Sequence, residues 1–72
     1  MERTPVESAV LKSVGYDATH RTLDVELRSG AVYRYFDVPP DVHHRLLAAE
    51  SRGRAYDQEV KKPGFRFERI DD

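Results

Sequence analysis

The most regular pattern in the chain is an alternation of apolar and acidic residues over positions 22–28. Apolar side chains would lie on one face of a strand and carboxylates on the other, namely Leu23, Val25 and Leu27 against Asp24 and Glu26. Two segments rich in β-branched and aromatic residues, 9–16 and 31–38, flank this pattern. The sequence therefore predicts three antiparallel strands, of which the second and third form a hairpin around Ser29-Gly30.

The length of the hairpin turn decides which way Tyr33 and Tyr35 point. A two-residue turn at Ser29-Gly30 would direct both rings to the solvated face of the sheet. A three-residue turn over 28–30 shifts the pairing by one residue and directs both rings to the core. We favour the longer turn because it requires a positive φ only at Gly30, whereas the shorter turn requires one at Ser29 as well.

The longer turn also produces favourable pairs across the hairpin. The predicted pairs are Leu27 with Ala31, Val25 with Tyr33, Asp24 with Arg34, and Leu23 with Tyr35. The pairing of Asp24 with Arg34 brings opposite charges together, which favours this register. The face away from the core would then carry an exposed strip of Val32, Arg34 and Phe36, with Phe36 as its most accessible aromatic residue.

The C-terminal half of the chain predicts two short helices and a closing strand. Apolar residues recur at helical spacing over 40–50, after prolines of a kind tolerated in a first helical turn. A second short helix is expected over 54–61, and an alternation over 65–69 predicts the last strand. The predicted fold class is α+β: a small antiparallel sheet of three to four strands packed against two short helices, in the order β-β-β-α-α-β.

The length of the chain indicates a single domain. We divide it into a flexible leader over 1–7, one domain over 8–70 and an acidic tail over 71–72. No apolar run approaches the length of a membrane span, and the N-terminus lacks the features of a signal peptide. The expected location is therefore the cytoplasm, and a membrane is not an expected partner.

Residues that could carry chemistry are few. Cysteine is absent, and the adjacent His43 and His44 would diverge by about 100° on a helix, so they cannot hold one metal ion together. His20 stands alone in a loop, and solvated histidines are favoured over a metal or general-base role. Asp24 and Glu26 share a strand face, but a salt-bridged surface is favoured over paired catalytic carboxylates. We predict no enzyme activity, no cofactor and no metal site.

Charge is distributed unevenly along the chain. The net charge is −1, yet residues 52–69 hold six basic and three acidic residues, a net charge of +3. This mild basic excess is compatible with phosphate contacts, although a solvated charged surface is the alternative. Adding the residues of the exposed strip, the candidate nucleic-acid contacts are Arg34, Phe36, Arg52, Arg54, Lys61, Lys62 and Arg66.

An ordered series of short motifs extends over about residues 8–70. They are Val14-Gly15-Tyr16-Asp17, Leu23-x-Val25-x-Leu27, Ser29-Gly30, Tyr33-Arg34-Tyr35, Asp37-Val38-Pro39, Leu46-Leu47-x-Ala49-x-Ser51-x-Gly53, and the tail from Arg54 through Val60-Lys61. In these motifs the chain resembles the KTSC domain, a module named from the C-terminus of some lysyl-tRNA synthetases and also found alone in bacterial proteins. It departs from that pattern at His43, Ala55 and Asp57, where a tyrosine, a phenylalanine and an asparagine are more typical.

The resemblance implies a single-domain bacterial protein, with RNA binding as the activity proposed for the family. Tyr33, Tyr35 and nearby cations would then be candidate contacts, whereas the hairpin register assigns both rings to the core, and both assignments stay open. The leading hypothesis is a small non-catalytic binding module for RNA or tRNA. The alternative is a protein-interaction or adaptor module that uses a sheet edge or the exposed sheet face to bind another protein.

Overall fold

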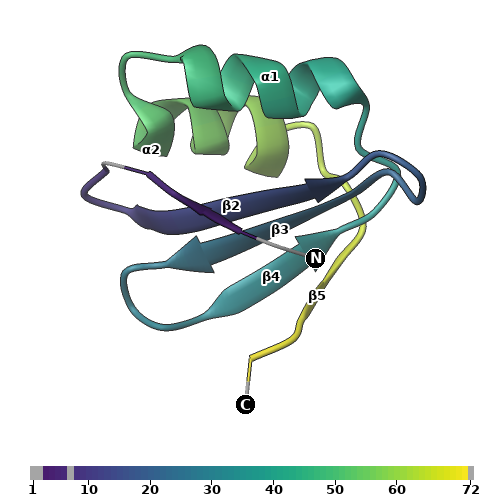
Figure 1. The fold of residues 1–72 in the computed structure, drawn as a ribbon, viewed down its shortest axis with the longest axis horizontal. Coiled ribbons are helices and arrows are strands. Elements are labelled where there is room, and N and C mark those ends of the chain that lie inside the picture. Colours follow the sequence, from purple (N-terminus) through teal and green to yellow (C-terminus); the bar gives the residue numbers. More distant parts are fainter. Residues whose placement is uncertain (1–2, 7, 72) are drawn as a thin grey trace.

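The computed structural model describes residues 3–6 and 8–71, and its centre is an antiparallel sheet of five strands. The strands lie side by side in chain order, so each pairs with the strand that follows it (Figure 1). Their bounds are Thr4–Pro5 (β1), Leu11–Asp17 (β2), Thr22–Leu27 (β3), Val32–Tyr35 (β4) and Phe67–Arg69 (β5).

The helices lie together on one face of the sheet (Figure 1). They are α1 (Pro40–Ala48), α2 (Arg52–Tyr56) and a π-helical turn, η1 (Asp57–Lys61), which continues directly from α2. Helix α1 begins with Pro40 after an extended Pro39. A proline is tolerated at the first helical position because a backbone N–H there would have no partner within the helix. Helix α2 is capped by Ser51, whose hydroxyl oxygen accepts a hydrogen bond from the backbone N–H of Arg54.

The order of the longer elements confirms the predicted α+β fold. The sequence pattern does not predict strand β1, which pairs Thr4 with Val14 and Pro5 with Ser13 at one edge of the sheet. A proline is tolerated there because an edge strand has one side without ladder partners. Part of the segment expected to be a loose leader therefore adds a short strand. Residues 1, 2 and 7 of that segment, and residue 72 of the acidic tail, lie outside the described residues.

The hairpin of β3 and β4 has the register predicted from the longer turn. The observed pairs are Leu23 with Tyr35, Asp24 with Arg34, Val25 with Tyr33, and Glu26 with Val32. Gly30 has a φ of 101°, and its N–H donates to the carbonyl oxygen of Leu27 at 3.0 Å. A single glycine in a left-handed conformation therefore sets the side on which both tyrosines lie.

The core fills the space between the helices and the sheet. Its buried members are Leu11, Val14, Leu23, Val25, Tyr35, Val38, Val42, Leu46, Tyr56 and Val60. Leu11 and Val14 are an odd number of positions apart, which in a regular strand would place them on opposite faces. A bulge between Leu11 and Ser13 shifts the register and lets both side chains enter the core.

The face of the sheet away from the helices, the open face, differs from the prediction at Val32. This residue is only 7% exposed, so the expected exposed strip over 32–36 does not exist as such. The chain beyond β5 runs alongside β4: the N–H of Ile70 donates to the carbonyl of Val32 at 2.8 Å, and the N–H of Val32 donates to Asp71 Oδ1 at 3.2 Å. Arg34 and Phe36 remain half-buried.

Candidate functional site

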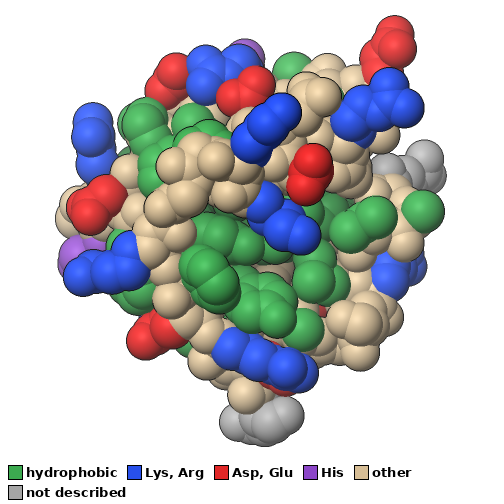
Figure 2. All heavy atoms as spheres, turned by 180° about the vertical axis from the view of Figure 1, so that it is seen from behind, with side chains coloured by type: hydrophobic (Ala, Val, Ile, Leu, Met, Phe, Trp, Pro, Cys, Tyr) green, Lys and Arg blue, Asp and Glu red, His purple; other side chains and the backbone are tan. Residues whose placement is uncertain are grey.

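The helix layer covers the sheet unevenly, and this produces a hollow. Leu23 and Val25 of β3 are 0% exposed, whereas Tyr33 of β4 is half-buried and Phe67 of β5 is 56% exposed. Cover on the helix side therefore decreases from β3 towards β5. Figure 2 shows a face of the molecule on which hydrophobic side chains gather around a depression, with charged side chains at its margin.

This depression has a volume of about 390 Å³, and we call it the aromatic hollow. It is lined by four aromatic residues, two charged residues and three small or aliphatic ones: Tyr33, Tyr35, Tyr56, Phe67, Asp57, Lys61, Val10, Leu27 and Gly53. Most of the lining comes from β4 and β5 on one side and from α2 and η1 on the other, and Leu27 of β3 and Val10 complete it. A site of this kind exists only when the sheet and the helices are assembled.

The rings of the aromatic hollow pack with tilted and edge-to-face geometries. Phe67 lies opposite Tyr35 in the strand register, and their ring centroids are 5.4 Å apart. The ring of Tyr33 meets Phe67 at 5.7 Å with an interplanar angle of 76°. These arrangements are favoured by the ring quadrupoles and hold the rings in place while leaving an apolar surface for a further planar group.

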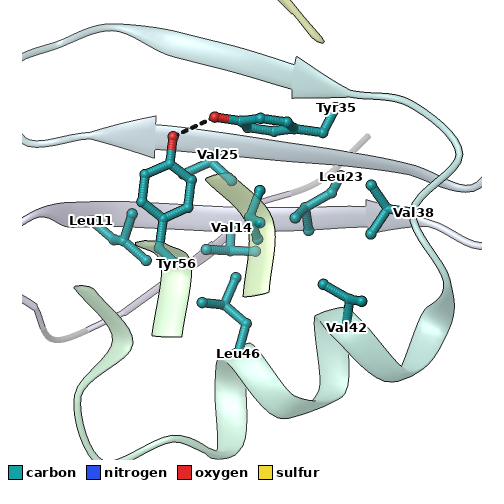
Figure 3. Packing of buried hydrophobic residues seen from close by; sticks show 10 residues of the cluster. Leu11, Val14, Leu23, Val25, Tyr35, Val38, Val42, Leu46 and Tyr56 are labelled. Carbon is teal, nitrogen blue, oxygen red and sulfur yellow. Dashed lines mark hydrogen bonds between the residues drawn. The ribbon is translucent and has the colours of Figure 1, made fainter. Parts of the chain in front are cut away.

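The floor of the hollow is a hydrogen-bonded pair of tyrosines. Tyr35 and Tyr56 are each 4% exposed, and their hydroxyl oxygens lie 2.6 Å apart (Figure 3). Burial raises the pKa of Tyr35 above its usual value. Burial also raises the pKa of Tyr56, and the hydrogen bond with Tyr35 raises it further. Both phenols therefore stay protonated, and the floor carries no charge at neutral pH.

The rim of the hollow carries one cation close to a ring. The Nζ atom of Lys61 lies 5.9 Å from the centroid of the Tyr56 ring, within the range of a cation–π interaction. Lys61 is exposed, as is Asp57 one helical turn earlier. An exposed lysine has a flexible stem, so its ammonium group can reach an anionic group held at the mouth of the hollow.

A second depression, the polar hollow, lies on the open face and has a volume of about 450 Å³. It is lined by Asp17, His20, Thr22, Arg34, Phe36, Asp37 and Arg66. The guanidinium carbon of Arg66 lies over the Phe36 ring at 4.6 Å from its centroid, which is within the range of a cation–π interaction. The polar hollow therefore also contains an accessible planar surface.

Two other charged groups of the polar hollow, Arg34 and Asp17, have side-chain partners. Arg34 donates two hydrogen bonds to the carboxylate of Asp24, at 2.8 and 3.0 Å, which confirms the predicted ion pair. Asp24 is 3% exposed, so this pair is more deeply buried than the surface bridge that we expected. The hydrogen bond to Asp24 raises the pKa of Arg34. His20 contacts Asp17 at 2.8 Å, and this hydrogen bond lowers the pKa of the Asp17 carboxyl.

The candidate contacts predicted from the sequence do not form one patch. Arg34, Phe36 and Arg66 meet in the polar hollow, and Lys61 lines the aromatic hollow. Lys62 and Arg54 are exposed but line neither hollow.

Arg52, another predicted contact, has a structural role. It is half-buried and donates a hydrogen bond to the backbone carbonyl of Leu47 at 3.0 Å. Its Nε atom is buried and finds no partner among the described residues. The guanidinium group therefore ties the start of α2 to the end of α1.

Two of the four aromatic residues of the aromatic hollow, Tyr56 and Phe67, are absent from the set of predicted site residues. The alternation over 65–69 places Phe67 on one face of its strand, but the sequence does not indicate which strand it pairs with. The helical pattern predicts Tyr56 only as an apolar position of a short helix. The observed pairing of β4 with β5 brings Phe67 to Tyr35, and the packing of α2 brings Tyr56 to the same place.

The three histidines lie in different environments. His43 is half-buried and stacks on Tyr16 with a centroid distance of 4.9 Å, and burial lowers its pKa. His20 and His44 are exposed. Within residues 3–6 and 8–71, no group of three or more histidine and carboxylate side chains is placed to hold a metal ion. No helix in the same residues is long and apolar enough to cross a bilayer.

Comparison with known sequences finds relatives of two sizes. The chain is 46% identical over 71 residues to an uncharacterized protein of Stutzerimonas stutzeri, covering 99% of this chain and 100% of that protein. It is 39% identical over 64 residues to a lysine–tRNA ligase of Nostoc punctiforme, covering 89% of this chain. The match spans only 11% of the ligase. Related sequences therefore occur both at this length and as a small segment of a much larger protein.

A solved structure agrees with these sequence matches. The crystal structure of a KTSC domain protein from Yersinia pestis superimposes with a TM-score of 0.89 at 36% identity, covering 96% of each chain. The sequence pattern of the KTSC domain matches residues 7–65, most of the length of this chain. The chain therefore belongs to the KTSC domain family, as its motifs indicated.

Proposed function

We propose that this protein is a small non-catalytic module that binds single-stranded RNA and takes an unpaired base into the aromatic hollow. The observation that carries the proposal is the assembly of Tyr33, Tyr35, Tyr56 and Phe67 around one apolar depression with Lys61 at its rim. Proteins recognise unpaired bases mainly by stacking them on aromatic rings and guanidinium planes. Each such contact is worth about 1–3 kcal/mol.

In this proposal the tyrosines serve both the core and a binding surface, and the position of each ring supports such a double role. Tyr35 belongs to the core, as the hairpin register predicted, and also forms the floor of a depression that opens to solvent. Tyr33 lies on the same side but is half-buried, so its ring is available to a ligand. The rings of Tyr33 and Tyr35 face the helices but are not completely buried, because the helix layer does not extend over β5.

The charges of the site suit a weak and salt-sensitive RNA ligand. Lys61 supplies a cation next to the apolar surface, which matches a nucleotide with its planar base and anionic phosphate. The net charge of −1 gives no strong long-range attraction for RNA, so most of the binding energy must come from stacking. A ligase segment related to this chain supports RNA as the ligand, because that segment is part of a protein named for tRNA.

An NMR titration of isotope-labelled protein tests this proposal. A short single-stranded RNA is expected to shift the resonances of Tyr33, Tyr56, Lys61 and Phe67 far more than a blunt RNA duplex of the same sequence. The β1 edge and the exposed side of α1 serve as internal controls. Absence of shifts at millimolar RNA, or equal shifts from the duplex, would contradict base insertion.

A second candidate function, the binding of an extended peptide, is suggested by the outer edge of β5. The carbonyl oxygen of Arg66 accepts a hydrogen bond from the N–H of Phe36, and the N–H of Ile70 donates to Val32, so these backbone groups face β4. The backbone groups of Phe67 and Arg69 then point away from the sheet and can pair with the peptide. Peptide binding would slow amide hydrogen exchange at these two residues, whereas RNA binding in the hollow would leave their exchange rates nearly unchanged.

A further inference from the structure

The aromatic hollow and the polar hollow lie on opposite faces of the sheet, and both are lined by residues of β4 and by residues at or next to the start of β5. They share no lining residue, yet residues adjacent in sequence alternate between them. Tyr35 and Phe67 line the aromatic hollow, whereas Phe36 and Arg66, their neighbours in the chain, line the polar hollow. The alternation follows from the strand period of two residues, which directs successive side chains to opposite faces.

Each hollow offers a planar surface next to β5. On the helix side this surface consists of Phe67 with Tyr33 and Tyr35. On the open face it is the guanidinium group of Arg66, which lies over the Phe36 ring and belongs to an exposed residue. A guanidinium plane backed by an aromatic ring is a surface on which bases stack, and its positive charge attracts phosphate.

The edge between the two surfaces is narrow and uncovered. β5 is the last strand of the sheet and has three residues, all of them exposed. No strand in the described residues pairs with its outer side. Arg66 and Arg69 stand on either side of Glu68 along this edge, and Arg69 holds Asp71 through two hydrogen bonds at 2.6 and 3.0 Å.

We propose that one RNA strand crosses the β5 edge and places bases on both sides of the sheet, an inference that rests on the RNA-binding function proposed above. One base occupies the aromatic hollow, and another stacks on the pair formed by Arg66 and Phe36. The phosphate backbone between them passes over β5. Arg66 precedes β5 and lies over the Phe36 ring, whereas Arg34 and Arg69 are held by carboxylates. The binding unit is therefore longer than one nucleotide.

The dependence of affinity on RNA length tests this inference. Binding constants would be measured for a nucleoside monophosphate and for oligonucleotides of increasing length, from a dinucleotide to a hexanucleotide. Phe67→Ala is expected to weaken every ligand, because each one uses the aromatic hollow. Arg66→Gln is expected to leave the mononucleotide unchanged and to weaken the hexanucleotide by about 5- to 150-fold, the loss of one stacking contact.

A matched control separates stacking from charge. Arg54→Gln removes the same charge at an exposed position that lines neither hollow, and it is expected to change hexanucleotide affinity by no more than a small factor. Phe36→Leu is a second variant on the open face, which keeps most of the side-chain volume and should reproduce the length-dependent loss. Thermal unfolding of each variant would confirm that the fold is intact.

The outcomes distinguish the inference from the function on which it rests. If no RNA binds at any length, the proposed function fails and the inference with it. A second outcome is that the hexanucleotide binds and Phe67→Ala weakens it, while Arg66→Gln and Phe36→Leu have no greater effect than Arg54→Gln. The RNA strand then stays on one face of the sheet, and only the inference is overturned. The inference would also be overturned if Arg66→Gln weakened binding of the mononucleotide and of the hexanucleotide by the same factor.

Discussion

The hydroxyl oxygens of Tyr35 and Tyr56 lie 2.6 Å apart and join β4 to α2 beneath the aromatic hollow. Neither phenol has much access to water, since each residue is 4% exposed. Each hydroxyl therefore depends on the other to satisfy its hydrogen bond. The pair couples the floor of the candidate site to the stability of the whole domain.

We expect Tyr56→Phe to destabilise the protein by about 1–3 kcal/mol, because the buried hydroxyl of Tyr35 then has no partner. Tyr35→Phe should have a similar effect for the same reason. The double variant should lose much less than the sum of the two, since no unsatisfied hydroxyl remains. Urea unfolding of the four proteins in a double-mutant cycle measures this, and strictly additive losses would argue against a mutually dependent pair.

The buried ion pair of Asp24 and Arg34 is expected to respond unequally to removal of its partners. The side chain of Asp24 is 5% exposed, whereas that of Arg34 is 36% exposed. Arg34→Met leaves a carboxylate buried without its cation and should cost about 3–5 kcal/mol. Asp24→Asn should reduce the stability by less, because the guanidinium group of Arg34 is partly exposed and can be hydrated instead. Denaturation midpoints of both variants test the asymmetry, and an equal or reversed order would contradict it.

Acid sensitivity of the C-terminal segment is expected from Asp71. Hydrogen bonds from Arg69 and from the N–H of Val32 lower the pKa of this carboxyl from 3.8 to about 2. A depressed folded-state pKa contributes stability that is present above about pH 4 and is lost as the pH falls towards 2. Asp71→Asn should therefore be less stable than the native protein at neutral pH, with the difference vanishing near pH 2. Unfolding curves over this range of pH would test the prediction, and a difference independent of pH would exclude the mechanism.

The hairpin turn should be sensitive to any residue that disfavours a left-handed backbone. A Cβ atom at Gly30 would meet no atom within 4 Å, so substitution there introduces backbone strain without a steric clash. We expect Gly30→Ala to lose about 1 kcal/mol or somewhat more. Gly30→Asn should lose less, because asparagine adopts positive φ more readily. Thermal unfolding measures both variants, and equal stability of native and alanine proteins would contradict the assigned turn.

The salt dependence of RNA binding should be shallow. If Lys61 and Arg66 make the main phosphate contacts, log affinity should fall against log salt concentration with a slope of about −1.5, and at most about −4 if all six cations of 52–69 took part. Lys61→Met should reduce this slope by about 0.7. Lys62→Met is the matched control, because Lys62 is exposed and lies outside both hollows. Equal losses from the two lysines would indicate a diffuse electrostatic contact.

Local sequence patterns by themselves determined the hairpin and the order of the elements from β2 onward, but not the short edge strand β1. The alternation over 22–28, the position of Gly30 and the opposite charges of Asp24 and Arg34 are sufficient to predict the hairpin register and the direction of both β4 tyrosines. These features act over a few residues, where backbone conformation and cross-strand pairing limit the alternatives. The order of strands and helices follows from the same kind of local periodicity.

Tertiary structure alone decided the candidate site. Phe67 reaches Tyr35 only because β5 pairs with β4, and Tyr56 reaches Tyr35 only because α2 packs over the sheet. The basic residues over 52–69, which form one cluster in the sequence, separate between two hollows and the exposed surface. Contacts between residues far apart in the chain depend on how whole elements pack, and no local pattern in a single sequence encodes that packing.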